Sequence, residues 1–489
     1  MSADKTSGPP DFRTSGQVLS RRSLLAKAGN GFGLLGLAAL CDQLGLQAGE
    51  GVNPLAAKPG HFPVKAKSVI WLFMNGGPSH IDTWDYKPEL EKRDGQELAG
   101  LDKDTGFFTD QVGPLMKSPF AFAQHGQSGA WVSEIFPQQA KQVDKMAFLH
   151  GCWTDSNNHA PALLKINSGM ARMGFPSMGS WMTYGLGSES RDLPAFVVMT
   201  DPQGRGVPKG HSGNWSAGFL PSIYQGTGLR PQGVPITDLD RPKGVDAGSQ
   251  RAQLDLLGRL DRRAAAGDNE LEARIESFEL AFRMQTSAPE ALAIDSEPAH
   301  IRALYGLDDK RCAHYGRQCL MARRLVERGV RCVQIYSGGM ENEKSWDGHV
   351  DIAGNHRGFA GETDTPIAGL LEDLAQRGLL DQTLVICCGE FGRLPVVQRA
   401  KDSKATGRDH NPHAYTTWLA GGGVKAGVHH GATDEIGFKA VEGRVSTHDL
   451  HATILHLMGI DHERLTYRFN GRDYRLTDVE GEVVKAVLA

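Results

Sequence analysis

The sequence lacks the features that mark nucleic-acid-binding and cysteine-zinc proteins. Its 489 residues show no basic stripe and no interleaving of basic with aromatic side chains, and 53 basic and 57 acidic residues are mixed along the chain. The formal net charge is −4. This pattern argues against nucleic acid as a partner, since nucleic-acid-binding proteins gather positive charge on one face. No Cys-x-x-Cys pair is present, so cysteine-bound zinc is not expected.

The N-terminus also lacks an apolar run long enough to span a membrane. The apolar stretch from Phe32 to Leu46 is short and rich in glycine. It follows the twin arginines Arg21 and Arg22, and this order resembles a twin-arginine export signal. An N-terminal amphipathic helix is the alternative. We therefore expect residues 1–60 to be signal and spacer, and a periplasmic or extracellular protein without a membrane span after the signal is removed.

Cysteines are few, and six of the seven lie beyond the predicted signal: Cys152, Cys312, Cys319, Cys332, Cys387 and Cys388. An even number in an exported protein permits disulfides. However, Cys387 and Cys388 sit inside an apolar run, where buried free thiols are the simpler interpretation.

Continuous apolar runs predict strands that are covered on both faces. They are Lys67–Met74, Met146–His150, Pro194–Met199, Val330–Tyr336, Thr383–Cys388 and Tyr415–Ala420. Amphipathic helices are predicted between them, over Cys319–Arg328 and Pro366–Arg377, each followed by glycine. This alternation predicts an α/β fold with right-handed parallel crossovers.

Two further regions are read as helical. The charged region 238–297 contributes no motif and is predicted to be a helical insertion. Thr447 is predicted to cap a late helix with Asp449 in its first turn. His448, Asp449 and His451 are candidate metal ligands, although helix capping and packing explain them nearly as well.

Three segments far apart in the chain carry side chains that can bind a metal. They are Phe73–Asp82, Cys388–Arg393 and Gly407–His413. The first two follow apolar runs and the third comes just before one. Since ligand sites in α/β sheets gather at one edge of the sheet, we expect these segments to form one metal centre.

The first segment turns at Gly76-Gly77, where glycine lets the backbone bend tightly. A carboxylate there, Asp82, suits a divalent metal, although an ordinary polar turn explains it equally well. Asp347 and His349, in a loop beyond the Val330 strand, can share one metal or act as a ligand and its orienting partner. A purely structural pair is the alternative.

The later segments add more candidate ligands. Glu390 directly follows a very apolar strand, where an unpaired carboxylate is costly, so it binds a metal or pairs with Arg393. Asp409, His410 and His413 bring three potential ligands into five residues. Imidazoles with carboxylates favour zinc, manganese or iron over calcium, while surface histidines are the alternative. A divalent cofactor is predicted, with its identity left open.

These motifs, in this order, resemble the DUF1501 family of exported bacterial proteins. The matching stretches are Phe73–Asp85, His159–Gly187, Asn214–Thr227, Gly389–Pro395 and Asp409–Gly427. The resemblance places residues 61–489 in the alkaline phosphatase superfamily, beside sulfatases and phosphomutases. It implies an alkaline-phosphatase-like α/β sandwich, with a mostly parallel central sheet and helices on both faces.

The resemblance also implies metal-ligand roles. Asp82 is the nearest candidate for the superfamily's first-strand carboxylate, because Asn75 occupies the strand end. Asp347 and His349 look like the carboxylate–histidine pair of one metal site. In addition, His410 or His413 looks like the late histidine ligand.

Two positions depart from the superfamily pattern. Glu390 stands where these enzymes place the aspartate of an Asp-His pair, and Phe391 stands where the histidine should be. Sulfatases carry a Cys or Ser nucleophile, then Pro two residues later, then Arg, but here these positions are His159, Pro161 and Leu163. Histidine cannot become formylglycine, so standard sulfatase chemistry is not expected.

Two functions follow from these observations. The first is an exported, metal-dependent hydrolase of phosphate or sulfate esters, acting on a small molecule or a polysaccharide. In it, His159 is a ligand or general base, and Arg393 or Lys165 offsets developing negative charge. Thr154 and Ser156 are the fallback nucleophiles.

The second function is a catalytically inactive relative that binds a sulfated or phosphorylated polymer, or a protein partner. Asn75, Phe391 and His159 each replace an expected catalytic type and favour this interpretation. The clustered His, Asp and Glu residues argue against it, because such groups are costly to hold together without a metal.

Overall fold

The computed structural model describes residues 53–100, 105–230, 236, 239–241, 244–264, 269–399 and 405–489. Residues 1–52, which contain the predicted export signal, lie outside the described residues. In the described part of the chain, no helix combines the length and the apolar character that crossing a membrane requires.

An eight-stranded sheet forms the centre of the fold, in the order β14-β5-β13-β9-β1-β8-β6-β7. The strands are β1 (Ser68–Met74), β5 (Met146–Cys152), β6 (Phe196–Met199), β7 (Thr227–Gly228), β8 (Cys332–Ser337), β9 (Thr383–Cys388), β13 (Tyr415–Ala420) and β14 (His429–His430). Neighbouring strands are parallel except at β13, which is antiparallel to both β5 and β9. The prediction of a mostly parallel sheet is confirmed.

β1 lies in the middle of the sheet and is buried along its whole length. It pairs with β8 on one side and β9 on the other, so that Ile70 lies between Val333 and Val385. Alternate side chains enter different cores. Ile70 and Leu72 belong to one apolar cluster, whereas Trp71 belongs to another. A continuous apolar strand is therefore explained by burial on both faces.

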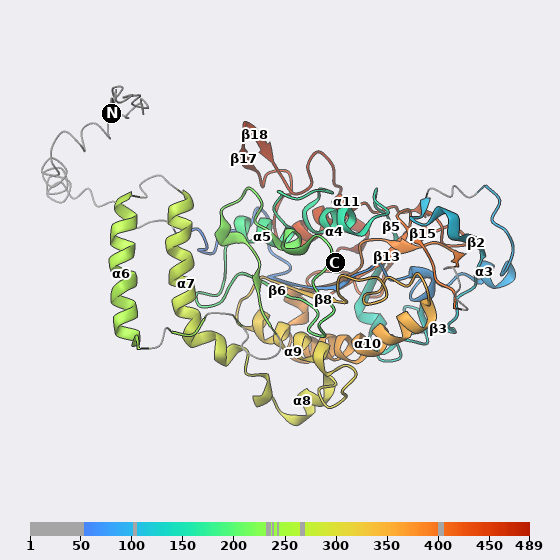
Figure 1. The fold of residues 1–489 in the computed structure, drawn as a ribbon, viewed down its shortest axis with the longest axis horizontal. Coiled ribbons are helices and arrows are strands. Elements are labelled where there is room, and N and C mark those ends of the chain that lie inside the picture. Colours follow the sequence, from blue (N-terminus) through green and yellow to red (C-terminus); the bar gives the residue numbers. More distant parts are fainter. Residues whose placement is uncertain are drawn as a thin grey trace, which may run out of the picture. The chain divides into compact units, whose positions relative to one another are not determined.

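Helices cover both faces of this sheet (Figure 1). The helices α9 (Ala313–Glu327) and α10 (Ile352–Gln376) contribute side chains to the core that contains Ile70. The helices α4 (His159–Ser168), α5 (Met178–Leu186) and α11 (Thr447–Leu457) contribute to the opposite core. The predicted α/β sandwich with helices on both faces is thus observed.

Two helices differ from their predicted bounds. α10 begins at Ile352, well before the predicted start at Pro366, and the proline is accommodated inside the helix. The side chain of Asp351 accepts a hydrogen bond from Gly354 N and caps this helix. α11 is capped by Ser446 rather than Thr447, because the Ser446 hydroxyl and the Asp449 side chain form a capping box.

The remaining elements are the helices of the predicted insertion, two short helices and several short strands. The region predicted as a helical insertion holds α6 (Ala247–Ala264) and α7 (Asn269–Ala291), and α3 (Pro88–Lys92) and α8 (Ala299–Leu304) are short helices. Five two-stranded ribbons pair β2 (Val112–Leu115) with β11 (Val396–Gln398), β3 (Phe122–His125) with β4 (Ala130–Ser133), β10 (Gly392–Arg393) with β12 (His410–Asn411), β15 (Ala432–Thr433) with β16 (Ala440–Glu442), and β17 (Tyr467–Phe469) with β18 (Arg472–Tyr474).

The six cysteines beyond the predicted signal are all buried free thiols. Cys388 accepts a hydrogen bond from Trp71 Nε1 at 3.0 Å across the sheet. Burial raises the pKa of the Cys387 thiol to well above its ordinary value. These cysteines therefore act as small core side chains, as the apolar run indicated for Cys387 and Cys388.

Candidate metal centre

The direction of β13 brings the third motif segment to the same edge of the sheet as the other two. β1, β8 and β9 are parallel, so the loops that follow them leave at one edge. β13 is antiparallel to β9, with Trp418 opposite Cys387, and its first residue therefore lies at that edge. The segment just before β13, which contains His410, reaches the site for this reason.

Four side chains meet there: His159, Asp347, His349 and His410. One ligand atom from each lies within 4.8 Å of all the others. The four residues are at most 5% exposed. They come from separate elements, with His159 at the start of α4, Asp347 and His349 in the loop after β8, and His410 in β12.

Asp347 is the centre of this cluster. Its Oδ2 lies 2.9 Å from His159 Nε2. Its Oδ1 lies 2.7 Å from His349 Nε2 and 3.2 Å from His410 Nε2. The Nε2 atoms of His349 and His410 are themselves 2.9 Å apart.

The other ring nitrogen of each histidine points outward to an oxygen. His159 Nδ1 lies 2.6 Å from Glu390 Oε1, His349 Nδ1 lies 2.6 Å from Gln398 Oε1, and His410 Nδ1 lies 2.6 Å from the backbone oxygen of Asn157. An oxygen acceptor requires the N–H on Nδ1. In the neutral imidazole, Nε2 then carries the lone pair, so three lone pairs face Asp347.

This donor set fits a divalent metal ion. His159 Nε2 and Asp347 Oδ2 are buried without a hydrogen-bond partner, although they are close to each other. The facing Nε2 atoms of His349 and His410 both carry lone pairs. In a tetrahedral zinc site, two imidazole nitrogens at about 2.0–2.1 Å from the ion are about 3.3 Å apart, so the two Nε2 atoms, now 2.9 Å apart, would separate slightly to take up the ion. A cation between these atoms would satisfy all of them.

The charged and titratable groups of the cluster shift one another's pKa values. Burial raises the pKa of Asp347, but Arg393 and His159 outweigh it and hold this pKa well below its ordinary value. Burial and the neighbouring His159 hold the pKa of His410 well below its ordinary value. Burial lowers the pKa of His159, but Asp347 and Glu390 outweigh it and raise that pKa. A metal ion would therefore compete with a proton at His159.

Arg393 and Glu390 tie the cluster to the end of β1. Arg393 is fully buried and donates to Gly77 O at 2.8 Å, to Gly76 O, and to Asp347 Oδ1 at 2.6 Å. Glu390 accepts from Gly76 N at 3.1 Å as well as from His159. In this arrangement Glu390 is an outer partner of His159 rather than one of the four clustered groups.

Besides Glu390 and Arg393, three other predicted site residues lie outside the cluster. Asp82 forms a buried ion pair with Arg408, with 2.7 Å between its Oδ2 and the arginine Nε. Lys165 pairs with Asp155 at 2.9 Å. The ring of His413 packs against Phe438.

The fallback nucleophiles also lie outside the four-residue cluster. Thr154 is buried, and its hydroxyl has no hydrogen-bond partner. The Ser156 hydroxyl is held by the local backbone at Asn158. Neither hydroxyl forms a hydrogen bond with a clustered histidine.

Several supporting residues carry no recognisable signal in the sequence. Gln398 lies in the short strand β11, and its amide is oriented by a hydrogen bond to Gln111. Asn157 contributes only its backbone oxygen, which residue type does not reveal. The rings of Phe108 and Phe107 pack on His349 and His410 at 4.9 Å and 5.9 Å between centroids. Only tertiary structure brings these groups together.

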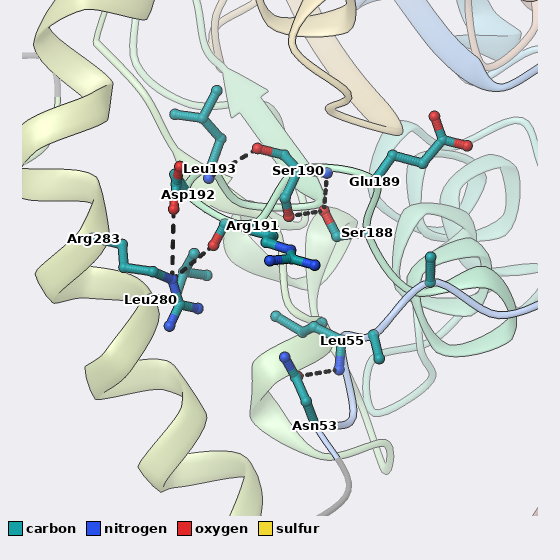
Figure 2. A pocket seen from close by; sticks show the side chains of 12 residues that line it. Asn53, Leu55, Ser188, Glu189, Ser190, Arg191, Asp192, Leu193, Leu280 and Arg283 are labelled. Atoms are coloured by element: carbon teal, nitrogen blue, oxygen red, sulfur yellow. Dashed lines mark hydrogen bonds and ion pairs between the residues drawn. The ribbon is translucent and has the colours of Figure 1, made fainter.

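A cavity of about 690 Å³ lies elsewhere, between the 188–193 loop, α7 and the segment that begins at Asn53. Figure 2 shows Arg283 of α7 directed toward Arg191 and Asp192 at its wall. None of the four clustered residues lines this cavity. The cavity is therefore separate from the metal centre.

The fold and the site define an α/β protein with a buried His-Asp cluster suited to a divalent metal. The chain matches the family described as "Protein of unknown function (DUF1501)" over residues 66–488, and it belongs to that family. A search of curated proteins finds no match.

Solved structures with similarity to the chain include an alkaline phosphatase, a sulfatase and a lipoteichoic acid synthase. An alkaline phosphatase mutant from the Antarctic bacterium TAB5, with Mg bound, is 10% identical, with a TM-score of 0.33 and coverage of 81% of this chain and 98% of that one. The PsFucS1 sulfatase from Pseudoalteromonas sp. is 11% identical, with a TM-score of 0.36 and coverage of 82% and 68%. The lipoteichoic acid synthase LtaP from Listeria monocytogenes is 10% identical, with a TM-score of 0.33 and coverage of 89% and 80%. These values are too low to transfer an activity.

Proposed function

We propose that this protein is a metal-dependent hydrolase of phosphate or sulfate esters, and that the His-Asp cluster is its metal centre. The observation that carries the proposal is the convergence of three imidazole Nε2 atoms on Asp347, each imidazole being fixed by an oxygen behind it. Such outer partners are typical of metal-binding histidines.

The ligands would be His159, Asp347, His349 and His410. Imidazole with carboxylate suits zinc, manganese or iron. When bound, a divalent ion polarises an ester oxygen and lowers the pKa of a bound water.

The charges around the centre favour an anionic substrate. Asp347 and Glu390 carry two negative charges, and Arg393 carries one positive charge. A divalent cation would reverse the net negative charge of this group and make the centre attractive to an oxyanion. Arg393 would act by holding Asp347 in place, because its donors are occupied by Asp347 and by backbone oxygens.

The aromatic side chains around the cluster keep water away from it. Phe391 packs on His159 and His410 with centroids 4.9 Å and 4.5 Å away, Phe107 packs on His410, and Phe108 packs on His349. A water-poor surrounding strengthens electrostatic interactions with bound groups.

The four clustered side chains are almost fully buried, and this observation favours a second candidate function. Structural metal sites are closed, whereas catalytic sites keep an open position. In this alternative the protein is inactive, and it binds a sulfated or phosphorylated polymer or a protein partner. For either function we place the protein outside the cytoplasm, on the strength of the twin arginines at positions 21 and 22.

The test combines metal analysis with turnover. Protein purified without chelators is analysed for metal and assayed with p-nitrophenyl phosphate and p-nitrophenyl sulfate, beside His349→Ala, His410→Ala and the exposed control His300→Ala. Metal and turnover that are lost only in the two cluster variants support the hydrolase. Metal without turnover supports the alternative. Protein that holds no metal and shows no turnover contradicts the hydrolase and also supports the inactive relative.

A further inference from the structure

A separate cleft of about 310 Å³ lies between the β3–β4 hairpin and the edge of the central sheet formed by β5 and β14. Its walls include Asp85, Tyr86, Gln124, Trp131, His150 and His429. None of these residues belongs to the metal cluster. The volume is at the lower end of the range for small-molecule sites, which suits a ligand of one or two rings.

Trp131 provides an exposed aromatic wall. It is the outward-facing residue of β4, and 38% of it is exposed, while its neighbours Ala130 and Val132 enter the core. A single exposed aromatic residue needs no explanation by itself. Here, however, Tyr86 packs on Trp131 with 4.5 Å between ring centroids, and both rings line the same cleft.

The walls of this cleft are held in place before any ligand binds. Tyr86 is supported from behind by Phe122 at 5.2 Å. His150 Nε2 and His429 Nδ1 are 3.0 Å apart, and both rings stack on Phe148. A fixed wall lowers the entropy cost of binding.

The turn of the β3–β4 hairpin is fixed in the same way. Asp144 accepts hydrogen bonds from the backbone N–H groups of Gln127 and Ser128. Gln124 Nε2 donates to Gly129 O across the hairpin, which leaves its amide oxygen for a ligand.

The polar groups of the cleft are electrically balanced. Asp85 pairs with Lys87 at 2.9 Å and accepts a hydrogen bond from Thr433 at 2.5 Å. Burial lowers the pKa of His150 to about 4, so its imidazole is neutral at neutral pH. Among the described residues that line the cleft, no side chain therefore offers an unpaired charge to an anion, and a neutral ligand fits best.

A pyranose ring matches this arrangement of an aromatic wall and a polar wall. One face of such a ring carries C–H groups that pack on an aromatic ring, and its rim carries hydroxyls that bond to amides, imidazoles and carboxylates. We infer that this cleft binds a neutral sugar residue of a saccharide, with the C–H face on Trp131 and the hydroxyls toward Asp85, Gln124 and His429.

One strand that lines the cleft, β5, ends on the side of the sheet where the metal centre lies. β5 carries His150 near its carboxyl end, and β13 is antiparallel to both β5 and β9. β5 therefore runs in the same direction as β9, and the carboxyl ends of both strands point to the end of the sheet where the cluster lies. Sugar binding nevertheless goes beyond the proposed hydrolysis and does not depend on it.

The test is isothermal titration of the full chain with neutral tetrasaccharides: cellotetraose, maltotetraose, chitotetraose and agarotetraose. We expect at least one to bind with a Kd of about 1 mM or tighter. Binding should weaken at least tenfold in Trp131→Ala and in His429→Ala. It should be unchanged in Phe469→Ala, which removes a residue of equal exposure on β17.

Two controls separate this inference from folding and from the metal centre. Circular dichroism of each variant checks the fold, and the exposed His429 gives a second variant if Trp131→Ala does not fold. Chelator-treated protein should bind the sugar as well as untreated protein does. Absence of binding by all four tetrasaccharides, or equal binding by wild type and both cleft variants, would overturn the inference.

Discussion

The hydrogen bond at the outward-facing nitrogen of each clustered histidine determines whether its inward-facing nitrogen can bind a metal ion. An oxygen acceptor at Nδ1 keeps the proton there and leaves Nε2 free to bind a cation. Glu390, Gln398 and the backbone oxygen of Asn157 fill this role for His159, His349 and His410. The three acceptors come from different parts of the chain, so the site depends on the folded structure.

Glu390→Gln tests this role directly. The amide keeps the shape of the side chain but removes the charge that faces His159, so we expect zinc affinity to fall about 10–100-fold. Competition titration with a chromophoric chelator measures the affinity. The matched control is Glu341→Gln, which changes an exposed glutamate. Unchanged affinity in Glu390→Gln would show that Glu390 does not support the centre.

Arg393→Met tests whether the arginine holds the turn after β1. The change leaves the oxygens of Gly76 and Gly77 and the buried carboxylate of Asp347 without their donor, and breaking such a pair costs on the order of 3–5 kcal/mol. Urea unfolding of chelator-treated protein measures the loss. The control Arg357→Met breaks a surface pair with Glu134, which is worth about 1 kcal/mol or less. Equal losses in the two variants would contradict this role.

Among the secondary-structure elements, the direction of β13 is what completes the site. A parallel strand would present its last residues at the ligand edge, but the motif residues come before β13. Only an antiparallel strand places His410 beside the loops that follow β8 and β9. The sequence pattern predicted a strand over Tyr415–Ala420 but contained nothing that fixed its direction.

Ser446→Ala tests the capping box of α11. The Ser446 hydroxyl accepts from Asp449 N at 3.1 Å, and Asp449 accepts from Ser446 N at 2.8 Å. Loss of an N-cap hydroxyl costs about 0.5–2 kcal/mol. The free energy of unfolding in urea should fall by that amount in Ser446→Ala. In a protein that already carries Asp449→Ala, the addition of Ser446→Ala should lower it by less. Full additivity of the two changes would contradict a shared capping box.

In the molecule as a whole, the buried framework was readable from the sequence. Apolar runs such as Thr383–Cys388 predict buried strands because burial on both faces leaves no polar alternation. Helix ends were less accurate. The sequence pattern predicts a helix that starts at Pro366, but packing of Phe359 and Ala360 in the core extends α10 back to Ile352.

The site was only partly readable. Asp347, His349 and His410 have side-chain types that indicate a metal, and the structure brings them together. Asp82 has the same chemistry but pairs with Arg408, a residue more than three hundred positions away. Sequence alone does not show which of these carboxylates folds beside the histidines and which does not.

The protein should lose stability in mild acid because it buries neutral histidines. His451 is fully buried, and its Nδ1 has no hydrogen-bond partner. Burial, and to a smaller extent the nearby His448, lower the pKa of His451 to about 3. As pH falls below about 6.5, the unfolded chain takes up a proton that the folded chain does not, so folding weakens until the pH nears 3.

His451→Gln should reduce this acid sensitivity. Between pH 6.5 and about pH 5, its unfolding free energy should fall by about 1–2 kcal/mol less than that of the wild type. Urea unfolding of chelator-treated proteins at both pH values measures this difference. The control His300→Gln, at an exposed position, should keep the wild-type slope. A wild-type slope in His451→Gln would contradict the assignment.

X-ray absorption at the metal edge of the purified protein shows whether the four clustered side chains bind a metal ion. We expect one divalent metal with scattering from about three imidazole rings and one carboxylate, as His159, His349, His410 and Asp347 would provide. A protein that holds no metal after purification without chelators, or a metal without imidazole neighbours, would contradict it.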